Sequence, residues 1–259
     1  MTLWQSISRS KENEHSVERA EAFLTVSNVD AHIQERTVLT DICFASDHDR
    51  IGIVGRNGSG KSTLARVLAG LIKPTSGVVR INGTDVASDR KAALRLVGVL
   101  FQNPDHQIIF PTVREELAFG LRQQGQSKNE AVDNVDRTLL RFDKSHWRDA
   151  SISTLSHGQK HLVCIMAITA MAPKLLILDE PFAGLDIPTI AQLKRHLTRF
   201  QGRILHISHN PLDLEDASQL LWLEEGRICE VGSRCEVLPA YLSRMQDLGG
   251  RDDLAVLAS

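Results

Sequence analysis

The sequence lacks a charge excess, a cysteine pattern and a long apolar run. Lys and Arg number 30 against 32 Asp and Glu, and this net charge of −2 argues against a globally basic nucleic-acid-binding protein. No C-x-x-C spacing occurs, so a disulfide framework or a zinc site is not expected. We instead expect reduced thiols at Cys43, Cys164, Cys229 and Cys235.

No segment is long and apolar enough to predict a membrane span. The longest strongly apolar stretch covers residues 162–171 and stops before Pro173, far short of the roughly 20 residues that cross a bilayer. Residues 1–21 mix basic and acidic side chains without an apolar segment, which predicts a flexible N-terminal tail rather than a secretory signal. Any membrane-spanning partner is therefore expected to be a separate polypeptide.

Short apolar runs alternate with helical patterns from residue 22 onward, which indicates an α/β fold with a mainly parallel sheet. Helices are predicted over 61–72 and 157–171, and more exposed strands over 23–29 and 38–44. Near-continuous apolar runs predict buried strands at 51–54, 97–101, 175–178, 204–207 and 220–223. The polar stretch between them, from 102 to 154, has helical spacing and predicts a helical insertion. After Gly232 the apolar residues show no clear helical or strand periodicity.

A glycine-rich segment follows the first buried run and opens a predicted helix. Backbone N–H groups of such a loop surround a phosphate, and the helix N-terminus favours negative charge. We expect Lys61 to reach the β- and γ-phosphates of a nucleotide and Ser62 to bind Mg²⁺. A glycine-rich turn that only caps a helix is the alternative. The matched pattern, G-x-x-x-x-G-K-[ST], comprises Gly55, Arg56, Asn57, Gly58, Ser59, Gly60, Lys61 and Ser62, with Thr63 next.

Two carboxylates end the predicted strand at 175–178, where open α/β sheets bind ligands. Asp179 is placed to hold Mg²⁺ through water, and Glu180 to accept a proton from an attacking water. Ser156 and Gln159 have the spacing of a capping box before an apolar helix, and such a helix start attracts anions. An ordinary helix start explains that segment as well.

With these motifs the chain resembles the ATP-binding cassette (ABC) ATPase family, whose signature is LSGGQ, over about residues 23–232. Gln102 matches the Q-loop, residues 155–159 match the signature, Asp186 ends a D-loop, and His209 matches the switch histidine. The resemblance implies a P-loop NTPase fold with an N-terminal antiparallel β subdomain and an inserted helical subdomain at about 103–172. The ABC ATPase domain is expected at 22–232 and a short C-terminal tail at 233–259.

The resemblance also implies a mechanism in which two ATPase subunits, identical or different, face each other head to tail. Each ATP then lies between one P-loop and the opposite signature, where Ser156, Gly158 and Gln159 complete its binding. Glu180 polarises the water, His209 contacts the γ-phosphate, and Gln102 senses Mg²⁺ and water as a further metal contact. Asp186 joins the two ATP sites.

Two positions depart from the family pattern. His157 stands where the signature has a glycine, so its side chain must point away from the phosphate or contribute charge there. The aromatic residue expected to stack on adenine is absent, which leaves His32 or Ile33 as candidates to cover the base.

The segments N-P-D-x-Q at 103–107 and T-V-x-E-E-x-A-F-G at 112–120 resemble the energy-coupling factor (ECF) group of vitamin and metal-ion importers. This implies a transmembrane scaffold subunit, a membrane substrate-binding subunit, no nucleic acid, and a peripheral place on the cytoplasmic membrane face. Glu115 and Glu116 are candidates to dock arginines of the scaffold, or they form an ordinary solvated acidic first turn.

Within this group the chain looks most like the ATPase of a biotin importer, with cobalt or nickel import as the alternative. A soluble ABC ATPase in DNA repair or translation is a further alternative. The segment between Gln102 and Leu155 is too short for the coiled coil of the repair proteins, and there is one cassette where the ribosome-associated proteins usually have two. A non-hydrolysing module is disfavoured because Glu180 and His209 are both present.

Overall fold

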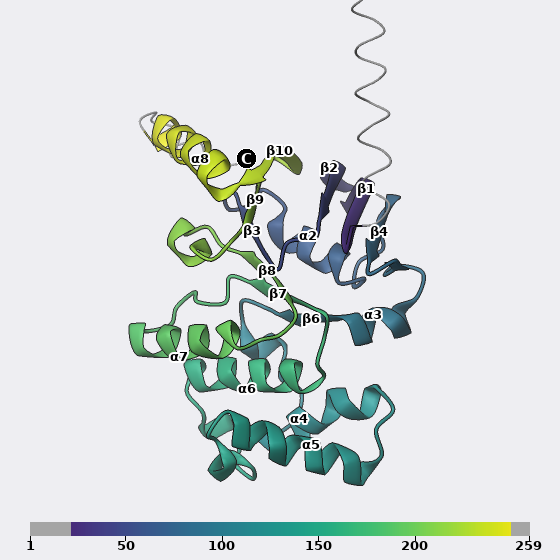
Figure 1. Ribbon diagram of the computed structural model, residues 1–259, viewed down its shortest axis with the longest axis vertical. Helices are drawn as coiled ribbons and strands as arrows, with labels where there is room; N and C mark the ends of the chain where they lie inside the picture. Colours follow the sequence, from purple (N-terminus) through teal and green to yellow (C-terminus); the bar gives the residue numbers. More distant parts are fainter. Residues whose placement is uncertain (1–21, 250–259) are drawn as a thin grey trace, which may run out of the picture.

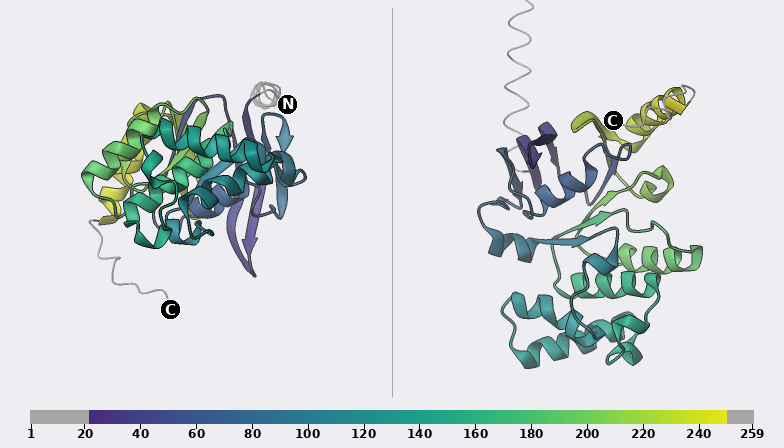
Figure 2. Two further views of the ribbon diagram at one scale, coloured as in Figure 1. Left: turned by 90° about the horizontal axis from the view of Figure 1, so that it is seen from below. Right: turned by 180° about the vertical axis from the view of Figure 1, so that it is seen from behind.

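The computed structural model describes residues 22–249. The predicted N-terminal tail, residues 1–21, lies outside the described residues, as do residues 250–259 of the predicted C-terminal tail. Two sheets and a group of helices follow one another along the long axis of the molecule (Figure 1). The four-stranded sheet lies toward one end and helices α4 and α5 form the other end, which the view from behind also shows (Figure 2).

The larger sheet has six strands in the order β10-β9-β3-β8-β7-β6. Strand β10 (Arg227–Ser233) is antiparallel to β9, and the other pairs are parallel. Nearly all residues of β3, β7 and β8 are buried, as expected for parallel strands covered on both faces. The predicted mainly parallel sheet is confirmed, with the five apolar runs forming β3 (Arg50–Val54), β6 (Val97–Leu100), β7 (Leu175–Asp179), β8 (Arg203–Ile207) and β9 (Gln219–Glu224).

The smaller sheet is antiparallel throughout, in the order β2-β1-β4-β5. Buried and more exposed side chains largely alternate along β1 and β2, because one face packs on the core and the other meets solvent. The buried face shares a hydrophobic core with β3 and α2 (Lys61–Leu68). This confirms the predicted N-terminal antiparallel sheet, which comprises β1 (Leu24–Ile33), β2 (Arg36–Ser46), β4 (Ser76–Ile81) and β5 (Thr84–Asp85).

Helix α3 (Arg90–Leu96) leads into β6, and the chain then forms only helices and turns before β7, apart from an isolated bridge between Thr112 and Ser151. These helices occupy the stretch predicted as a helical insertion, and they pack with α7 (Ile187–Thr198) on a second hydrophobic core. They are η1 (Pro104–His106), α4 (Val113–Gln123), α5 (Lys128–Arg141), η2 (Ser145–Trp147), η3 (Ile152–Thr154) and α6 (His157–Ala170).

Helix α8 (Arg234–Gly249) occupies most of the segment that we predicted as a short C-terminal tail without a clear period. Val237 and Tyr241 are buried in a small third core, together with residues of β3, β9 and η4 (Pro211–Leu214). The helix contains Pro239 and buries only these two side chains. Its apolar face is therefore too narrow to produce a recognisable helical periodicity in the sequence. The segment is therefore a docked helix rather than a simple tail.

The turn between β9 and β10 brings the last two strands against the glycine-rich loop. Glu225 and Gly226 both have positive φ, 46° and 74°, as tight hairpin turns require. The Gly226 N–H donates to the Ser59 carbonyl oxygen at 3.0 Å, and its own carbonyl accepts from the Thr40 N–H at 2.8 Å. A Cβ at Gly226 would lie 2.3 Å from the Val38 carbonyl oxygen, so only glycine fits this approach.

Candidate functional site

The glycine-rich loop leads from β3 into α2, as predicted, and no side chain caps this helix. Gly60 precedes it with φ of 103°, a left-handed conformation that glycine adopts without strain. The Lys61 side chain is buried, and its Nζ donates to the carbonyl oxygens of Gly55 and Arg56 at 2.8 Å each. Burial lowers the pKa of Lys61, against the raising effect of Glu180 and Asp179. The loop therefore presents uncapped N–H groups and a held ammonium, which suits a polyphosphate.

Asp179 ends β7 beside the start of α2. Asp179 is 5% exposed, and burial raises the pKa of its carboxyl group against the lowering effect of the nearby Ser62 hydroxyl. Its Oδ1 is buried without a protein partner. An unpartnered buried carboxylate oxygen next to a hydroxyl suits a hard cation such as Mg²⁺, which takes oxygen ligands and keeps several waters. Asp179, Ser62 and Gln102 line one cleft, so the residues that we predicted for Mg²⁺ lie together.

Glu180 follows Asp179 with φ of 51°, a conformation that is uncommon for a residue other than glycine. Its N–H donates to the Ile207 carbonyl oxygen at 3.0 Å, which ties it to the end of β8. Its carboxylate accepts the His209 N–H at 2.8 Å and lies 2.8 Å from His209 Nδ1. The ends of β7 and β8 thus hold the proposed base and the proposed switch histidine against each other.

These groups face one cleft of about 760 Å³. Lys61, Ser62 and Gln102 line it together with Glu180 and His209, and the β9–β10 turn closes one wall. The remaining lining residues are Arg36, Thr37 and Val38 of β2 and Asn57, Gly58, Gly60 and Thr63 of the loop and α2. This cleft therefore brings together the predicted phosphate loop, the catalytic pair and two of the predicted metal contacts. It shares Ser62 and Gln102 with the cleft that Asp179 lines.

Three signature residues, Ser156, Gly158 and Gln159, lie away from this cleft. Ser156 and Gln159 form the predicted capping box at the start of α6, with Gln159 N–H to Ser156 Oγ at 3.3 Å and Ser156 N–H to Gln159 Oε1 at 2.8 Å. Gly158 lies against Thr189 of α7, whose Cγ2 would be 2.8 Å from an added Cβ. Asp186 caps α7 by accepting from the Thr189 N–H at 3.1 Å. Among the described residues, neither Asp186 nor these signature residues line the cleft at Lys61.

His157, the departure from the signature, is exposed and lines the cleft of Asp179 and Gln102 in its own chain. Its ring packs edge-on against His161 one turn later, with centroids 4.9 Å apart. His161 is fully buried, and burial followed by the nearby His157 lowers its pKa to about 4. The histidine therefore adds an imidazole beside the proposed Mg²⁺ residues. Its contact with His161 follows from their spacing of four on the predicted helix, which places both on one face.

The two candidates for covering the base are not placed alike. His32 is held by its two ring nitrogens, with Nδ1 3.0 Å from Thr75 Oγ1 and Nε2 2.9 Å from Thr37 Oγ1. Neither His32 nor Ile33 lines the cleft in the part of the chain that the structure describes. Arg36, Thr37 and Val38 of β2 line it at that place.

The predicted docking pair divides into one exposed and one buried carboxylate. Glu115 is exposed at the start of α4 and pairs with the capping residue Thr112, whose hydroxyl donates to it at 2.5 Å. Glu116 is 7% exposed, and its Oε2 accepts the N–H groups of Ile109 and Phe110 at 2.9 Å each. The prediction of Glu116 as a docking carboxylate is therefore wrong, because this side chain holds the loop before α4.

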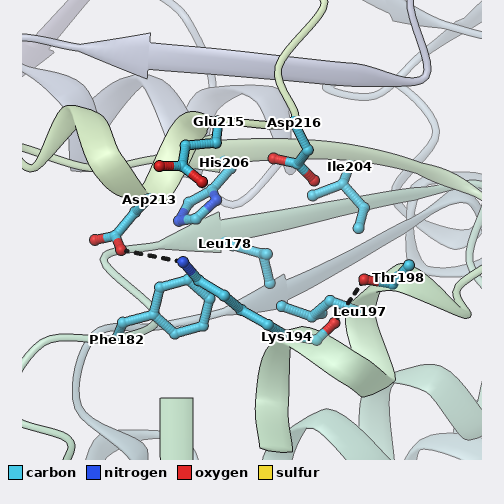
Figure 3. Close-up of a pocket in the computed structure, with 10 residues that line it drawn as sticks. All are labelled: Leu178, Phe182, Lys194, Leu197, Thr198, Ile204, His206, Asp213, Glu215 and Asp216. Carbon is cyan, nitrogen blue, oxygen red and sulfur yellow. Dashed lines mark hydrogen bonds and ion pairs between the residues drawn. The ribbon is translucent and has the colours of Figure 1, made fainter. Parts of the chain in front are cut away.

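A further hollow, of about 170 Å³, lies between α7, β8 and η4 on another part of the chain (Figure 3). His206 of β8 points into it and packs edge-on against Phe182, with ring centroids 5.3 Å apart. Its Nε2 is buried without a hydrogen-bond partner within the described residues, and His206 is 6% exposed. Burial, with a smaller effect of Lys194, lowers the pKa of His206 to about 3.

This buried imidazole makes the folded state sensitive to acid. Because the folded pKa is depressed below 6.5, the unfolded chain binds a proton that the folded chain does not. The stability contributed above pH 6.5 is therefore lost as the pH falls toward 3, by about 2 kcal/mol at about pH 5. Urea unfolding should be compared at about pH 6.5 and about pH 5. The free energy of unfolding should fall less between them for His206→Gln than for the unaltered chain. His146→Gln removes an exposed histidine as a control, and equal losses in all three proteins would contradict the prediction.

Comparison with known proteins agrees with this geometry. Residues 44–183 match the family described as ABC transporter. A biotin transport ATP-binding protein from Rhodobacter capsulatus is 46% identical over 82% of this chain and 90% of its own length. An energy-coupling factor transporter ATP-binding protein from Lacticaseibacillus paracasei is 35% identical over 78% of this chain and 75% of its own.

Similarity extends to solved structures. The structure of cbiO1 from Clostridium perfringens, described as part of the ABC transporter complex cbiONQ, superposes with a TM-score of 0.71. It is 28% identical and covers 90% of this chain and 96% of its own. The phosphate loop, the paired carboxylates and the histidine after β8 occur here in the fold of that family. The chain therefore belongs to the ABC transporter family and carries its ATP-binding ATPase domain.

Proposed function

We propose that this chain is the ATP-hydrolysing subunit of an ECF-type importer, with biotin as the favoured substrate. The observation that carries the ATPase site is the convergence of Lys61, Glu180 and His209 on one cleft. The importer type rests on the residues of 103–107 and 112–120 and on the relatives named for biotin transport and energy coupling. Cobalt or nickel is the alternative substrate.

In the proposed reaction, the phosphate loop and Lys61 would bind the triphosphate, and Ser62, Gln102 and Asp179, which line one cleft, would hold Mg²⁺. The ion would neutralise charge on the β- and γ-phosphate oxygens when bound. Glu180 accepts a proton from the attacking water, and His209 holds the Glu180 carboxylate in place and reaches the γ-phosphate. Hydrolysis then needs a second ATPase subunit, whose signature helix completes the phosphate contacts.

The proposed partners are a second ATPase subunit, a transmembrane scaffold and a membrane substrate-binding subunit. No helix of the described residues is long and apolar enough to cross a membrane. The proposal therefore places the chain on the cytoplasmic face of a cell membrane through these partners. Isolation of the intact complex in detergent, followed by identification of its membrane subunits and bound small molecule, tests this. ATP-driven uptake of biotin by the reconstituted complex would support the favoured substrate, whereas uptake of cobalt or nickel alone would replace it.

Glu115 remains the docking candidate at the exposed start of α4. We expect Glu115→Lys to weaken assembly with the scaffold by about fivefold or more, because charge reversal repels an arginine at the interface. Basal ATPase should fall less than assembly does. Asp133→Lys reverses an exposed charge on α5 and serves as the matched control. Quantitative pull-down and ATPase assays on the same preparations measure both effects, and an equal loss in both assays would refute a docking role.

A further inference from the structure

Ser208 and Asp213 lie directly behind the proposed base, although Asp213 belongs to none of the motifs. Ser208 follows β8, is 1% exposed, and its Oγ lies 3.4 Å from Glu180 Oε2 and 3.2 Å from Asp213 Oδ2. The same Oγ accepts the Asn210 N–H at 3.0 Å. One hydroxyl is thus placed between two carboxylates, of which one is the proposed base.

A serine hydroxyl carries a single proton and can donate it to only one acceptor at full strength. Glu180 and Asp213 therefore compete for the Ser208 proton. Asp213 is the nearer acceptor, and Glu180 Oε2 already faces His209 Nδ1 at 2.8 Å. If Asp213 were absent, the proton would turn to Glu180 and occupy a lone pair that an attacking water needs.

Asp213 is itself held from the opposite side. Lys194 of α7 lies with Nζ 3.7 Å from Asp213 Oδ1, and the same ammonium packs over the Phe182 ring at 5.2 Å (Figure 3). The Asp213 side chain is 17% exposed, which limits competition from water for this carboxylate. Helix α7 begins at the D-loop residue Asp186, so this contact links the D-loop helix to the loop after β8.

We propose that Asp213 is a positioning residue for ATP hydrolysis, because it takes the Ser208 hydroxyl proton and keeps that proton off Glu180. This inference rests on the proposed role of Glu180 as the base. In this proposal Lys194 holds Asp213 in place. The rate of turnover then depends on which carboxylate the Ser208 hydroxyl faces. Neither Asp213 nor Lys194 lines the cleft at Lys61 in the described part of the chain, so ATP binding should not depend on them.

A double-mutant cycle in the full-length protein tests the proposal. Asp213→Ala should lower kcat by about tenfold with KM for ATP changed by less than about twofold, because one misdirected hydrogen bond weakens the base. Ser208→Ala is measured alone to complete the cycle. The double variant should be at least about fivefold faster than Asp213→Ala, and equal to Ser208→Ala within about twofold, since no hydroxyl is left to misdirect.

The outcomes separate this role from its competitors. A double variant as slow as Asp213→Ala would overturn the proposal, because Asp213 would then act through the fold or through its charge. An Asp213→Ala variant with unchanged kcat would overturn it as well. Glu215→Ala removes a neighbouring exposed carboxylate that makes no bond to Ser208 and controls for charge alone. Glu180→Gln is assayed beside these variants, and full hydrolysis by that variant would refute the proposed base whatever the cycle shows.

Discussion

Lys61→Ala should abolish ATP-dependent turnover. The Lys61 ammonium is buried between two loop carbonyls and lies within the electrostatic reach of Asp179, Glu180 and Glu224. Its removal leaves these carboxylates without their central cation and takes a positive charge from the proposed phosphate site. We expect kcat/KM to fall by at least about a hundredfold, because loss of one partner from a buried charge cluster costs several kcal/mol. Steady-state hydrolysis assays measure the loss of turnover, and direct binding assays measure the loss of ATP affinity.

The control for this change is Lys73→Ala, which removes an exposed lysine from the loop after α2. Its turnover should match that of the unaltered protein. Thermal unfolding should be compared as well, because Lys61 donates two hydrogen bonds to its own loop. A folded Lys61→Ala protein with undiminished turnover would reject the assignment of the phosphate site.

The second large effect is expected for Glu180→Gln. The amide keeps the size of the side chain and can still accept the His209 N–H, but it cannot take a proton from water. General-base catalysis contributes about a hundredfold to ten thousandfold, so hydrolysis should fall by at least about a hundredfold while ATP still binds. With chemistry blocked, the ATP-bound dimer should accumulate.

Light scattering at saturating ATP and Mg²⁺ measures that dimer. A protein that remains monomeric under these conditions would count against the head-to-tail arrangement, even if hydrolysis is lost. Glu215→Gln changes an exposed carboxylate on the loop after η4 and should neither slow hydrolysis nor trap a dimer. The two readouts therefore test the base and the assembly separately.

Local patterns were sufficient to predict the centre of this fold. The apolar runs at β3, β7 and β8 are short and continuous because helices cover both of their faces, and that burial is visible in the residues themselves. The capping box of Ser156 and Gln159 depends only on residues three apart, and it forms as predicted. The phosphate loop is likewise contained in one short segment.

Features that depend on contacts between distant segments could not be predicted in this way. The pair at Glu115 and Glu116 looks equivalent along the chain, yet one side chain faces solvent and the other turns back to the N–H groups of Ile109 and Phe110. Helix α8 was missed because it docks through few apolar side chains. Asp213 could not be found from the sequence, because it belongs to no motif. Ser208 comes to lie between Asp213 and Glu180 only when β7 and β8 pair.

The hydrogen bond between Gly226 and Ser59 has a consequence for synthesis of the protein. The phosphate loop lies in the first quarter of the chain, but one wall of its cleft comes from the β9–β10 turn near the other end. A ribosome must therefore release the chain as far as the β9–β10 turn before this wall of the nucleotide cleft can form. Nascent fragments that end before this turn lack that wall, so we expect ATP to stabilise the nascent chain more once Glu225 and Gly226 have emerged.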